Sequence, residues 1–519
     1  YLLEWLPHKA RYLSVLLSME APPESRICMQ CGRDGIFRCT ECAHSPIFCS
    51  NCCLDAHELN PFHRIQRWTG TFFEDFSVRL ISLVIHLGHG GKPCPMGGYN
   101  QRDNGSDEEE DWEDVEDDDR LPHLARLRDR GCLTVVHTNG VHFCDIWYCT
   151  CEASEDSHVQ LMMAGLFPAT TKSPRTAFSF QVLDDFIRDN VECGTTAMNY
   201  YSKLQRLTSN GFLHAVPDRY RELLRVSRAW QLLKLLKWKG FDGRSEEPEP
   251  GELVLFCPAC PQPGVNVPPT EEADLTNWKY SRIIAMDGNF KAEHMLLKRN
   301  TNEVWLMDGK GFMVTEQPYK RYLAGTANQV EKLDCSNHRA VNQANSNRSQ
   351  LASTGIGGCS CARHGCFIPH AMVNFQRGEQ QVNMDYALVH AVQHGMQHEQ
   401  KVINFYDINC QYSKNLYSWI NRNQFISLPP GIQPGIGIWH VHGHQTQCFV
   451  RYAPNFIPGA GNVDGEIMET LWSSLNIISP STRGMVAPHR QEILDFQMND
   501  SNFLKMVHMR KFGSPSHMG

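Results

Sequence analysis

The chain has 519 residues, a formal net charge of −8, 41% hydrophobic residues and 20% charged residues. This length predicts two to four domains with at least one sizeable core, and the composition is typical of a soluble globular protein. A membrane-spanning helix is excluded, since the longest apolar candidate, Leu80–Ile85, stops after six residues where about 18 are needed. We find no secretory signal, and because the chain begins at Tyr1 we expect a fragment or a trimmed product.

The negative charge is concentrated in one segment. Between Asp107 and Asp119, eleven of thirteen residues are acidic and none is basic. Without that segment the net charge changes from −8 to about +3, so the negative total does not exclude a nucleic-acid partner.

Residues 24–66 carry cysteine pairs with the spacing of zinc ligands. The candidate ligands are Cys28, Cys31, Cys39, Cys42, Cys49, Cys52, His57 and His63. Eight such ligands can fill two tetrahedral zinc sites, and metal would supply folding energy that the few large apolar residues here cannot. Unliganded buried cysteines are the alternative. Across the chain, CxxC and CxC pairs near histidines favour thiolate ligands in a reducing compartment over disulfides.

This module resembles a B-box-type zinc finger. The resemblance implies two cross-braced sites and leaves Cys53 as a spare. The first ion would be held by Cys28, Cys31, Cys49 and Cys52, and the second by Cys39, Cys42, His57 and His63.

Two connecting segments follow. We expect residues 67–100 to form a short amphipathic connection and residues 101–125 an acidic, disordered linker. Alternatively, the acidic tract folds back and competes with DNA for a basic surface.

Residues 130–245 form the next predicted module. Cys149-Thr-Cys151 presents two thiolates that could bind metal, and two structural cysteines are the alternative. Tyr220–Lys239 has apolar residues at helical spacing and six basic residues, which predicts an amphipathic helix docked through its apolar face. Its basic side could also contact DNA phosphates. The candidate contacts are Arg219, Arg221, Arg225, Arg228, Lys234 and Lys237.

From about residue 250 we expect a large α/β domain, after joints rich in proline and glycine. Ser281–Asp287 and Val402–Asp407 each predict a buried strand that ends in a carboxylate, and Val304–Met307 predicts a strand adjacent to the first. Carboxylates at such strand ends converge at one edge of a sheet. Asp464–Trp472 predicts a capped helix start, with Glu466, Glu469 and Trp472 on one face.

Three carboxylates are what two divalent ions need for in-line phosphoryl transfer. Spacing alone does not single them out, because Asp308, Asp334 and Asp385 are further candidates and any single aspartate is commonly a loop or cap residue.

Several segments resemble the Kyakuja–Dileera–Zisupton (KDZ) transposases, found mainly in basidiomycete fungi. His137–Cys151, Leu166–Thr170, Pro174–Phe178 and Cys257–Pro261 are similar to the CxC cysteine-cluster domain that accompanies these enzymes. Three further segments are similar to the catalytic blocks, and they are Asp287–Phe290, Tyr406–Gln411 and Asp464–Ser473.

The resemblance implies an α/β fold with an RNase H-like catalytic core, in which helices flank a mixed sheet that carries a Cys-rich insertion. We assign this core to residues 250–519 and expect it to be incomplete at the C-terminus. The implied acidic (DDE) triad is Asp287, Asp407 and Glu469, with Glu466 as the alternative glutamate. Family members commonly have Glu-Arg where this chain has Glu469-Thr470, a departure that could weaken DNA contact or mark a decaying copy.

Two further groups could bind metal or be ordinary core and surface residues. The first matches the Cys-rich insertion of the family and comprises Cys335, His338, Cys359, Cys361, His364 and Cys366. The second, His440-Val-His442-Gly-His444 with Cys448, predicts a metal site, phosphate contacts or plain turn histidines. Trp439 and Trp472 could stack on a DNA base or be buried in the core.

The sequence therefore predicts a nuclear DNA transposase that uses Mg²⁺ or Mn²⁺ for catalysis and Zn²⁺ for structure. Its expected partners are transposon-end DNA and further copies of itself in a synaptic complex, with no membrane. The alternative is a catalytically inactive, domesticated zinc-binding protein that contacts DNA or protein. A ubiquitin-ligase component would rest on residues 24–66 alone.

Overall fold

The computed structural model describes residues 2–100, 132–269, 274–297, 304–326, 350–397 and 399–512. The acidic linker, residues 101–125, and two predicted zinc ligands, Cys335 and His338, lie outside the described residues. The chain divides into two compact units. The first comprises Tyr1–Phe186 and Ala197–Ser227, and the second Ile187–Thr196 and Arg228–Gly519.

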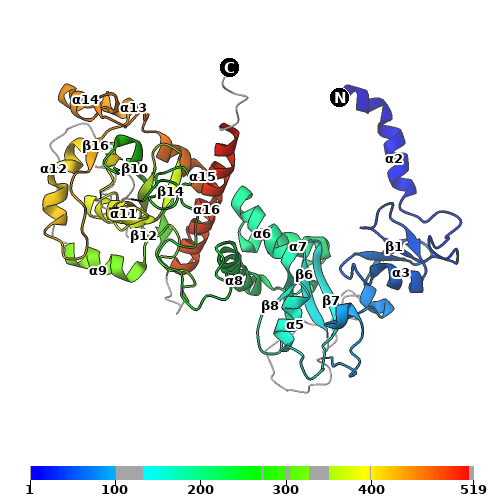
Figure 1. Ribbon diagram of the computed structural model, residues 1–519. Helices are drawn as coiled ribbons and strands as arrows, with labels where there is room; N and C mark the ends of the chain where they lie inside the picture. The colour runs from blue at the N-terminus through cyan, green and yellow to red at the C-terminus, as the bar shows by residue number, and fades with distance from the viewer. Residues whose placement is uncertain are drawn as a thin grey trace. The chain divides into compact units, whose positions relative to one another are not determined.

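The first unit begins with short helices and a small sheet, coloured blue in Figure 1. The helices are α1 (Leu2–Trp5), η1 (Leu6–His8), α2 (Lys9–Ser18) and α3 (Ser50–His57). The sheet has the order β2-β1-β3-β4, with β1 at Phe37–Cys39, β2 at Ile47–Phe48, β3 at Ile65–Trp68 and β4 at Phe73–Phe76. Its buried core consists of four cysteines with Phe37, Phe48, Ile65, Val78 and Leu83, which agrees with a module too small to fold on apolar contacts alone.

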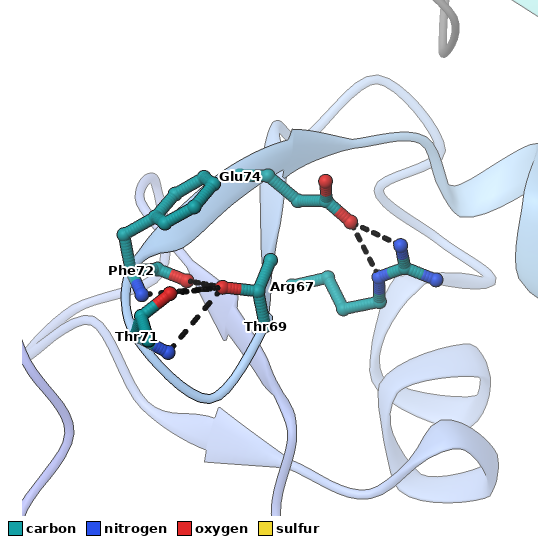
Figure 2. A network of polar contacts seen from close by, with 5 residues as sticks. All are labelled: Arg67, Thr69, Thr71, Phe72 and Glu74. Carbon is teal, nitrogen blue, oxygen red and sulfur yellow. Dashed lines mark hydrogen bonds and ion pairs between the residues drawn. The ribbon is translucent and has the colours of Figure 1, made fainter.

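The hairpin of β3 and β4 shows how local polar contacts define a turn (Figure 2). Arg67 and Glu74 face each other across the two strands, and Arg67 Nε donates to Glu74 Oε1 at 2.6 Å. At the turn, Thr69 Oγ1 donates to the carbonyl of Phe72 at 2.9 Å and accepts from the Phe72 N–H at 3.2 Å. The threonine side chain thus gives the Phe72 N–H an acceptor, and it gives the Phe72 carbonyl a second donor beside the Thr69 N–H.

A second, five-stranded sheet in this unit has the order β5-β7-β6-β9-β8. Its strands are β5 (Val84–His86), β6 (Leu133–His137), β7 (Gly140–Trp147), β8 (Leu166–Pro168) and β9 (Thr176–Ser179). The helical elements in this part of the chain are η2 (Val78–Ile81), η3 (His89–Gly91), α5 (Ser157–Met163), α6 (Phe180–Cys193), α7 (Ala197–Thr208), η6 (Leu213–Ala215) and α8 (Tyr220–Trp238). Of these, α6 and α8 continue into the second unit.

The segment 67–100 is therefore more than a connection. It supplies β4 to the first sheet and β5, paired in parallel with β7, to the second. Short, half-buried segments of this kind form strands only when they pair with partners distant in the sequence.

The second unit is built on a mixed sheet of order β14-β13-β10-β15-β16. Its strands are β10 (Arg282–Asn289), β13 (Gly355–Cys361), β14 (Cys366–Phe375), β15 (Val402–Phe405) and β16 (Gln433–Gly435), and a separate pair is formed by β11 (His294–Met295) and β12 (Leu351–Ser353). β13 is antiparallel to both β10 and β14, whereas β15 is parallel to both β10 and β16.

Helices cover both faces of this sheet, so its strands are apolar on both sides. The helical elements are η7 (Trp278–Tyr280), α9 (Glu316–Thr326), α11 (Gln381–Gln393), α12 (Asn409–Ile420), α13 (Ile438–Val441), α14 (Thr446–Tyr452), η8 (Pro454–Phe456), α15 (Ile467–Thr482) and α16 (Ala487–Phe512). In one core, Ile283 and Ala285 of β10 lie with residues of α15 and α16. In the other, Ile284 and Met286 lie with residues of α9, α11 and α12.

One strand prediction was wrong. Val304–Met307 forms no strand, and the chain there bends into a turn at Asp308–Gly309. The strands that flank β10 are instead β13 and β15. The apolar run is explained by burial without strand pairing, since Met307 packs in a small cluster with Leu235, Leu253 and Phe496. Among the described helices, none combines the length and the apolar character that crossing a bilayer requires.

Candidate catalytic and metal-binding sites

The pairing of β10 with β15 places Asp287 and Asp407 next to each other. The last paired residues of these parallel strands are Ala285 and Phe405, and each aspartate follows two residues later. Neighbouring strands are about 4.8 Å apart, and residues two apart face the same side of a sheet. Since Ala285 and Phe405 both belong to the core that includes α15, the two aspartates lie on the side of that helix.

The third acidic element is the start of α15. Asp464 Oδ1 accepts a hydrogen bond of 2.9 Å from the backbone N–H of Glu466, which is the N-cap residue of the helix. Glu469 lies in the first turn and is exposed, whereas Glu466 is half-buried. The helix start therefore presents two carboxylates to the same region.

Asp287 is held in place from α15. The indole Nε1 of Trp472 donates a hydrogen bond of 2.8 Å to Asp287 Oδ2. Burial raises the pKa of Asp287 to about 7; the hydrogen bonds from Trp472 and from the Gly288 backbone oppose that shift, and the negative charges of Asp407 and Glu469 add to it. A carboxyl surrounded by other carboxyls in this way is suited to binding a cation.

Asp407 has a different partner. His440 of α13 lies between two carboxylates, with Nδ1 3.3 Å from Asp407 Oδ2 and Nε2 3.0 Å from Glu466 Oε1. Burial raises the pKa of Asp407, the positive charge that His440 can carry opposes the shift, and Glu466 and Glu469 add to it. Glu466 is thus engaged by His440, whereas Glu469 acts electrostatically on both aspartates.

A fourth carboxylate, Glu379, was not predicted from the sequence. The hydroxyl of Tyr406 donates to its Oε1 at 2.5 Å, and a Cβ at Gly288 would lie 2.6 Å from its Oε2. Burial raises the pKa of Glu379 to about 8, Asp287 and Asp407 add to that rise, and the Tyr406 hydroxyl opposes it. Glu379 stands in the polar loop between β14 and α11, where spacing gives no sign of a buried acid.

The cysteines and histidines of residues 24–66 converge in two groups of four. Cys28, Cys31, Cys49 and Cys52 form one group, and Cys39, Cys42, His57 and His63 the other. In each group the ligand atoms lie within 4.8 Å of one another, so each could hold a metal ion such as zinc. His57 Nδ1 lies 2.7 Å from the Cys53 carbonyl oxygen, which directs Nε2 toward the group in the manner of a supported zinc ligand.

A third group joins Cys149 and Cys151 to two residues from the segment 67–100. His89 Nε2 is 3.2 Å from Cys149 Sγ and 3.4 Å from Cys151 Sγ, and Cys94 Sγ is 3.7 Å from Cys151 Sγ. The sequence analysis identified only the CxC pair. His89 and Cys94 lie more than 50 residues earlier, and no local spacing connects them to it.

A fourth group lies in the second unit and comprises Cys257, Cys260, Cys361 and His364. Cys257 Sγ is 3.3 Å and Cys361 Sγ 3.2 Å from His364 Nδ1. The short connection from β13 to β14 carries Cys361 and His364 together. From the sequence, Cys257 and Cys260 were identified only as part of a segment similar to the CxC domain, not as metal ligands. In the structure they complete a set of four potential ligands.

Two cysteines expected in that set have other surroundings. Cys359 is buried in the apolar core with Ile284 and Met286, and burial raises its thiol pKa. Cys366 packs against the fourth group without being among its four converging ligands. β13 stays in register with β10, with Cys359 opposite Met286 and Cys361 opposite Ile284. The two cysteines therefore differ in their position along the strand, and only Cys361, at the end of β13, reaches the fourth group.

The basic helix α8 forms over nearly the predicted range. Its cations differ in their contacts. Arg228 Nε lies 2.7 Å from Glu492 Oε2, Arg219 pairs with Glu222 at 3.9 Å, and Lys234 Nζ lies 5.3 Å from the centre of the Trp230 ring. Three are exposed, namely Arg221, Arg225 and Lys237.

Two models of known protein families match separate segments of the chain. Residues 280–502, which contain Asp287, Glu379, Asp407, Glu466 and Glu469, match the Kyakuja-Dileera-Zisupton transposase family. Residues 122–211 match the CxC2 like cysteine cluster associated with KDZ transposases. No curated protein and no solved structure matches the chain. The chain therefore carries a segment of the KDZ transposase family at residues 280–502 and, at residues 122–211, the cysteine cluster that accompanies such transposases.

Proposed function

We propose that this chain is a DNA transposase that cleaves and joins DNA strands with a metal-dependent acidic triad of Asp287, Asp407 and Glu469. The observation that carries the proposal is the convergence of these acids from two parallel strands and one helix. Their place within residues 280–502, the segment of the KDZ transposase family, supports it.

The sheet supports an RNase H-like core. Numbered in chain order within this sheet, its strands have the order 3-2-1-4-5, with the second antiparallel to its neighbours and the first, fourth and fifth parallel. The parallel strands 1 and 4 carry the two aspartates, which follows the general rule that sites in α/β proteins form at the carboxyl ends of such strands.

The donor set fits Mg²⁺ or Mn²⁺. Hard divalent ions prefer carboxylate oxygens, and the site offers these from Asp287, Asp407 and Glu469. Trp472 donates to Oδ2 of Asp287, so Oδ1 is the candidate atom for binding an ion. Two ions held here would activate an attacking hydroxyl and stabilise the leaving oxygen during phosphoryl transfer.

The protein's own residues would orient this centre. Trp472 fixes the rotation of the Asp287 carboxylate, and His440 fixes one oxygen of Asp407. Trp439, adjacent to His440, is exposed and offers a surface on which an unpaired base can stack. The exposed cations of α8, Arg221, Arg225 and Lys237, are the candidates for phosphate contacts.

Glu469 is preferred over Glu466 as the third acid. The negative charge of Glu469 acts on both aspartates, whereas Glu466, whose charge also acts on Asp407, is engaged with His440. We assign Glu466 the role of orienting His440.

For the whole protein we propose a nuclear enzyme that binds transposon ends as a homo-oligomer in a synaptic complex. Zinc would hold the cysteine-rich groups. The experiment is strand cleavage of a transposon-end duplex by the purified chain with Mn²⁺, compared with Asp407→Ala. Equal cleavage by the two proteins would refute the triad.

A second candidate function is a non-catalytic zinc-binding adaptor derived from such an enzyme. The observation in its favour is Thr470, where related enzymes commonly have arginine. Metal titration separates the two, because an adaptor would bind zinc but would show no Mn²⁺ site that depends on Asp287 and Asp407.

A further inference from the structure

Cys410, His444 and Cys448 form another group of potential metal ligands, close in sequence to the acidic residues. One ligand atom of each lies within 4.8 Å of the other two, and Cys410 Sγ is 3.4 Å from His444 Nδ1. In a tetrahedral zinc site, bonds of about 2.3 Å to sulfur and about 2.0 Å to nitrogen place those two atoms about 3.5 Å apart. The observed separation therefore suits a single shared ion.

The three ligands come from three different elements. Cys410 lies in the first turn of α12, His444 follows the end of α13, and Cys448 lies in the first turn of α14. The backbone N–H of Cys448 donates to the Gln445 carbonyl at 2.8 Å, which starts the helix and turns Cys448 back toward His444. An ion here would join segments about 35 residues apart in the sequence.

The apolar core around this group is small. It consists of Cys410, Ile436, Val441 and Ala453, while Trp439, Val450 and Phe456 are exposed nearby. So few buried side chains contribute little stability, and a bound metal would supply what packing does not. Thiolate and imidazole ligands select zinc over the hard ions that carboxylates bind.

The group is linked by short peptide segments to the acidic site. Cys410 follows Asp407 by three residues, and His444 follows His440 by four. His440 in turn contacts both Asp407 and Glu466. Fixing Cys410 to His444 therefore fixes the strand end that carries Asp407 relative to the helix that carries His440.

Backbone packing supports the same arrangement. A Cβ at Gly437 would lie 2.4 Å from the Gly465 Cα, so the segments before His440 and before Glu466 approach as closely as glycine allows. The Ile438 N–H donates to the Val463 carbonyl at 3.2 Å. The segment before His440 is therefore held by backbone contacts with residues 463–465. The segment after His440 would be held by the group of Cys410, His444 and Cys448.

We propose that Cys410, His444 and Cys448 bind one zinc ion, with water as the fourth ligand, and that this ion positions His440 against Asp407 and Glu466. The zinc site stands on the ligand geometry alone. The positioning role rests on the proposed function of the acidic residues.

The first experiment measures zinc per chain by mass spectrometry of the elements in the purified full-length protein. Cys448→Ser should contain one zinc fewer than the wild type, while His444→Cys, which keeps three soft ligands, should retain it. Cys193→Ser is the matched control, because Cys193 is an exposed free cysteine and its removal should leave the zinc content unchanged. An equal zinc content in Cys448→Ser and wild type would overturn the site.

A measurement on the wild type covers the case in which Cys448→Ser does not fold. With zinc bound, Cys448 should resist alkylation, and removal of zinc by a chelator should make it reactive, as read by peptide mass mapping. Alkylation of Cys448 at the rate of Cys193 before chelation would overturn the proposal. So would a Cys410–Cys448 disulfide in protein purified under nitrogen.

The positioning role is tested by Mn²⁺ affinity of the acidic site. Loss of a supporting residue commonly costs about 10–100-fold in metal affinity, so Cys448→Ser should bind Mn²⁺ that much more weakly and His444→Cys should not. An unchanged Mn²⁺ affinity would refute the claim that zinc positions His440, but it would not affect the evidence for the zinc site itself. Asp407→Ala should keep all its zinc; if it also cleaves DNA normally, the proposed function fails while the zinc site survives.

Discussion

Trp472 and Asp287, 185 residues apart in the sequence, are joined by a hydrogen bond of 2.8 Å from the indole Nε1 to Oδ2. Trp472 is buried, and its ring lies 5.8 Å from that of Phe367 in the core beneath α15. The bond therefore links a rigid core residue to an acid at the candidate site. It ties the helix that carries Glu469 to the strand that carries Asp287.

We expect Trp472→Phe to weaken Mn²⁺ binding and DNA cleavage by about 10–100-fold, because the aromatic packing stays while the orienting hydrogen bond is lost. The Asp287 carboxylate would rotate more freely, and its pKa would rise further. Calorimetric Mn²⁺ titration and a cleavage assay measure both effects.

A matched control is Trp278→Phe, which changes an exposed indole outside the acidic site. It should behave as the wild type. If Trp472→Phe bound Mn²⁺ as tightly as Trp278→Phe, the orienting role of the indole would be wrong.

The two glutamates at the start of α15 should differ in effect. Glu469→Gln removes a proposed metal ligand and should lower the cleavage rate by a factor on the order of 100 or more, since metal-ion stabilisation is worth several kcal/mol. Glu466→Gln keeps an oxygen that can accept from His440 and should lower it by about tenfold at most. Single-turnover cleavage rates at saturating Mn²⁺ measure the difference. If Glu466→Gln lowered the cleavage rate more than Glu469→Gln, Glu466 would be the metal ligand and Glu469 would not.

The metal-free protein should lose stability as the pH rises. In the folded state the pKa of Asp287 is about 7 and that of Glu379 about 8, against about 3.9 and 4.3 in the unfolded chain. Between about pH 4 and pH 8 the folded state thus binds more protons, and the free energy of unfolding falls with increasing pH. Denaturant unfolding across this range, in buffer without Mg²⁺ or Mn²⁺ and with zinc retained, measures the trend.

Mn²⁺ should act in the opposite direction, because it replaces those protons and its stabilisation grows with pH. Asp287→Asn should flatten both trends. A wild type and an Asp287→Asn variant with the same pH dependence would contradict the account.

Glu379→Gln tests the fourth carboxylate. The amide oxygen can still accept the hydrogen bond from Tyr406, so the fold should be preserved. Because the pKa of Glu379, about 8, lies above that of Asp287, about 7, Glu379 is still mostly protonated where Asp287 loses its proton. Glu379→Gln should therefore leave the midpoint pH of Mn²⁺ binding close to that of the wild type, but the free energy of unfolding should fall less steeply between about pH 4 and pH 8. An unfolding free energy with the same pH dependence as the wild type would contradict the raised pKa of Glu379.

Features set by neighbouring residues could be predicted from the sequence. Ile283–Met286 and Val402–Phe405 are apolar enough to be buried strands. Asp287 follows the first directly, and Asp407 follows the second after Tyr406. The CxxC pairs of residues 24–66 converge in the two groups that the B-box resemblance implies. The geometry of a turn a few residues long determines where such ligands point, so the spacing of the cysteines and histidines is enough to predict that they converge.

Features that depend on long-range packing could not be predicted from the sequence. Cys257 meets Cys361, and His89 meets Cys149, only after strands distant in sequence have paired. Glu379 becomes an acid of the site through its approach to Gly288 and Tyr406. Val304–Met307 is apolar because Met307 is buried, not because it pairs in a sheet. A run of hydrophobic residues indicates that a segment is buried, but it does not indicate which other segment it packs against or pairs with.

The most direct test of the central claim is Mn²⁺-dependent strand cleavage by the wild type and by Asp407→Ala, with a transposon-end duplex as the substrate. Zinc content and the unfolding midpoint of both proteins serve as the control for folding. The account predicts cleavage by the wild type, none detectable with Asp407→Ala, and equal zinc in both. Cleavage by Asp407→Ala at the wild-type rate would contradict the claim that these acids form the catalytic site.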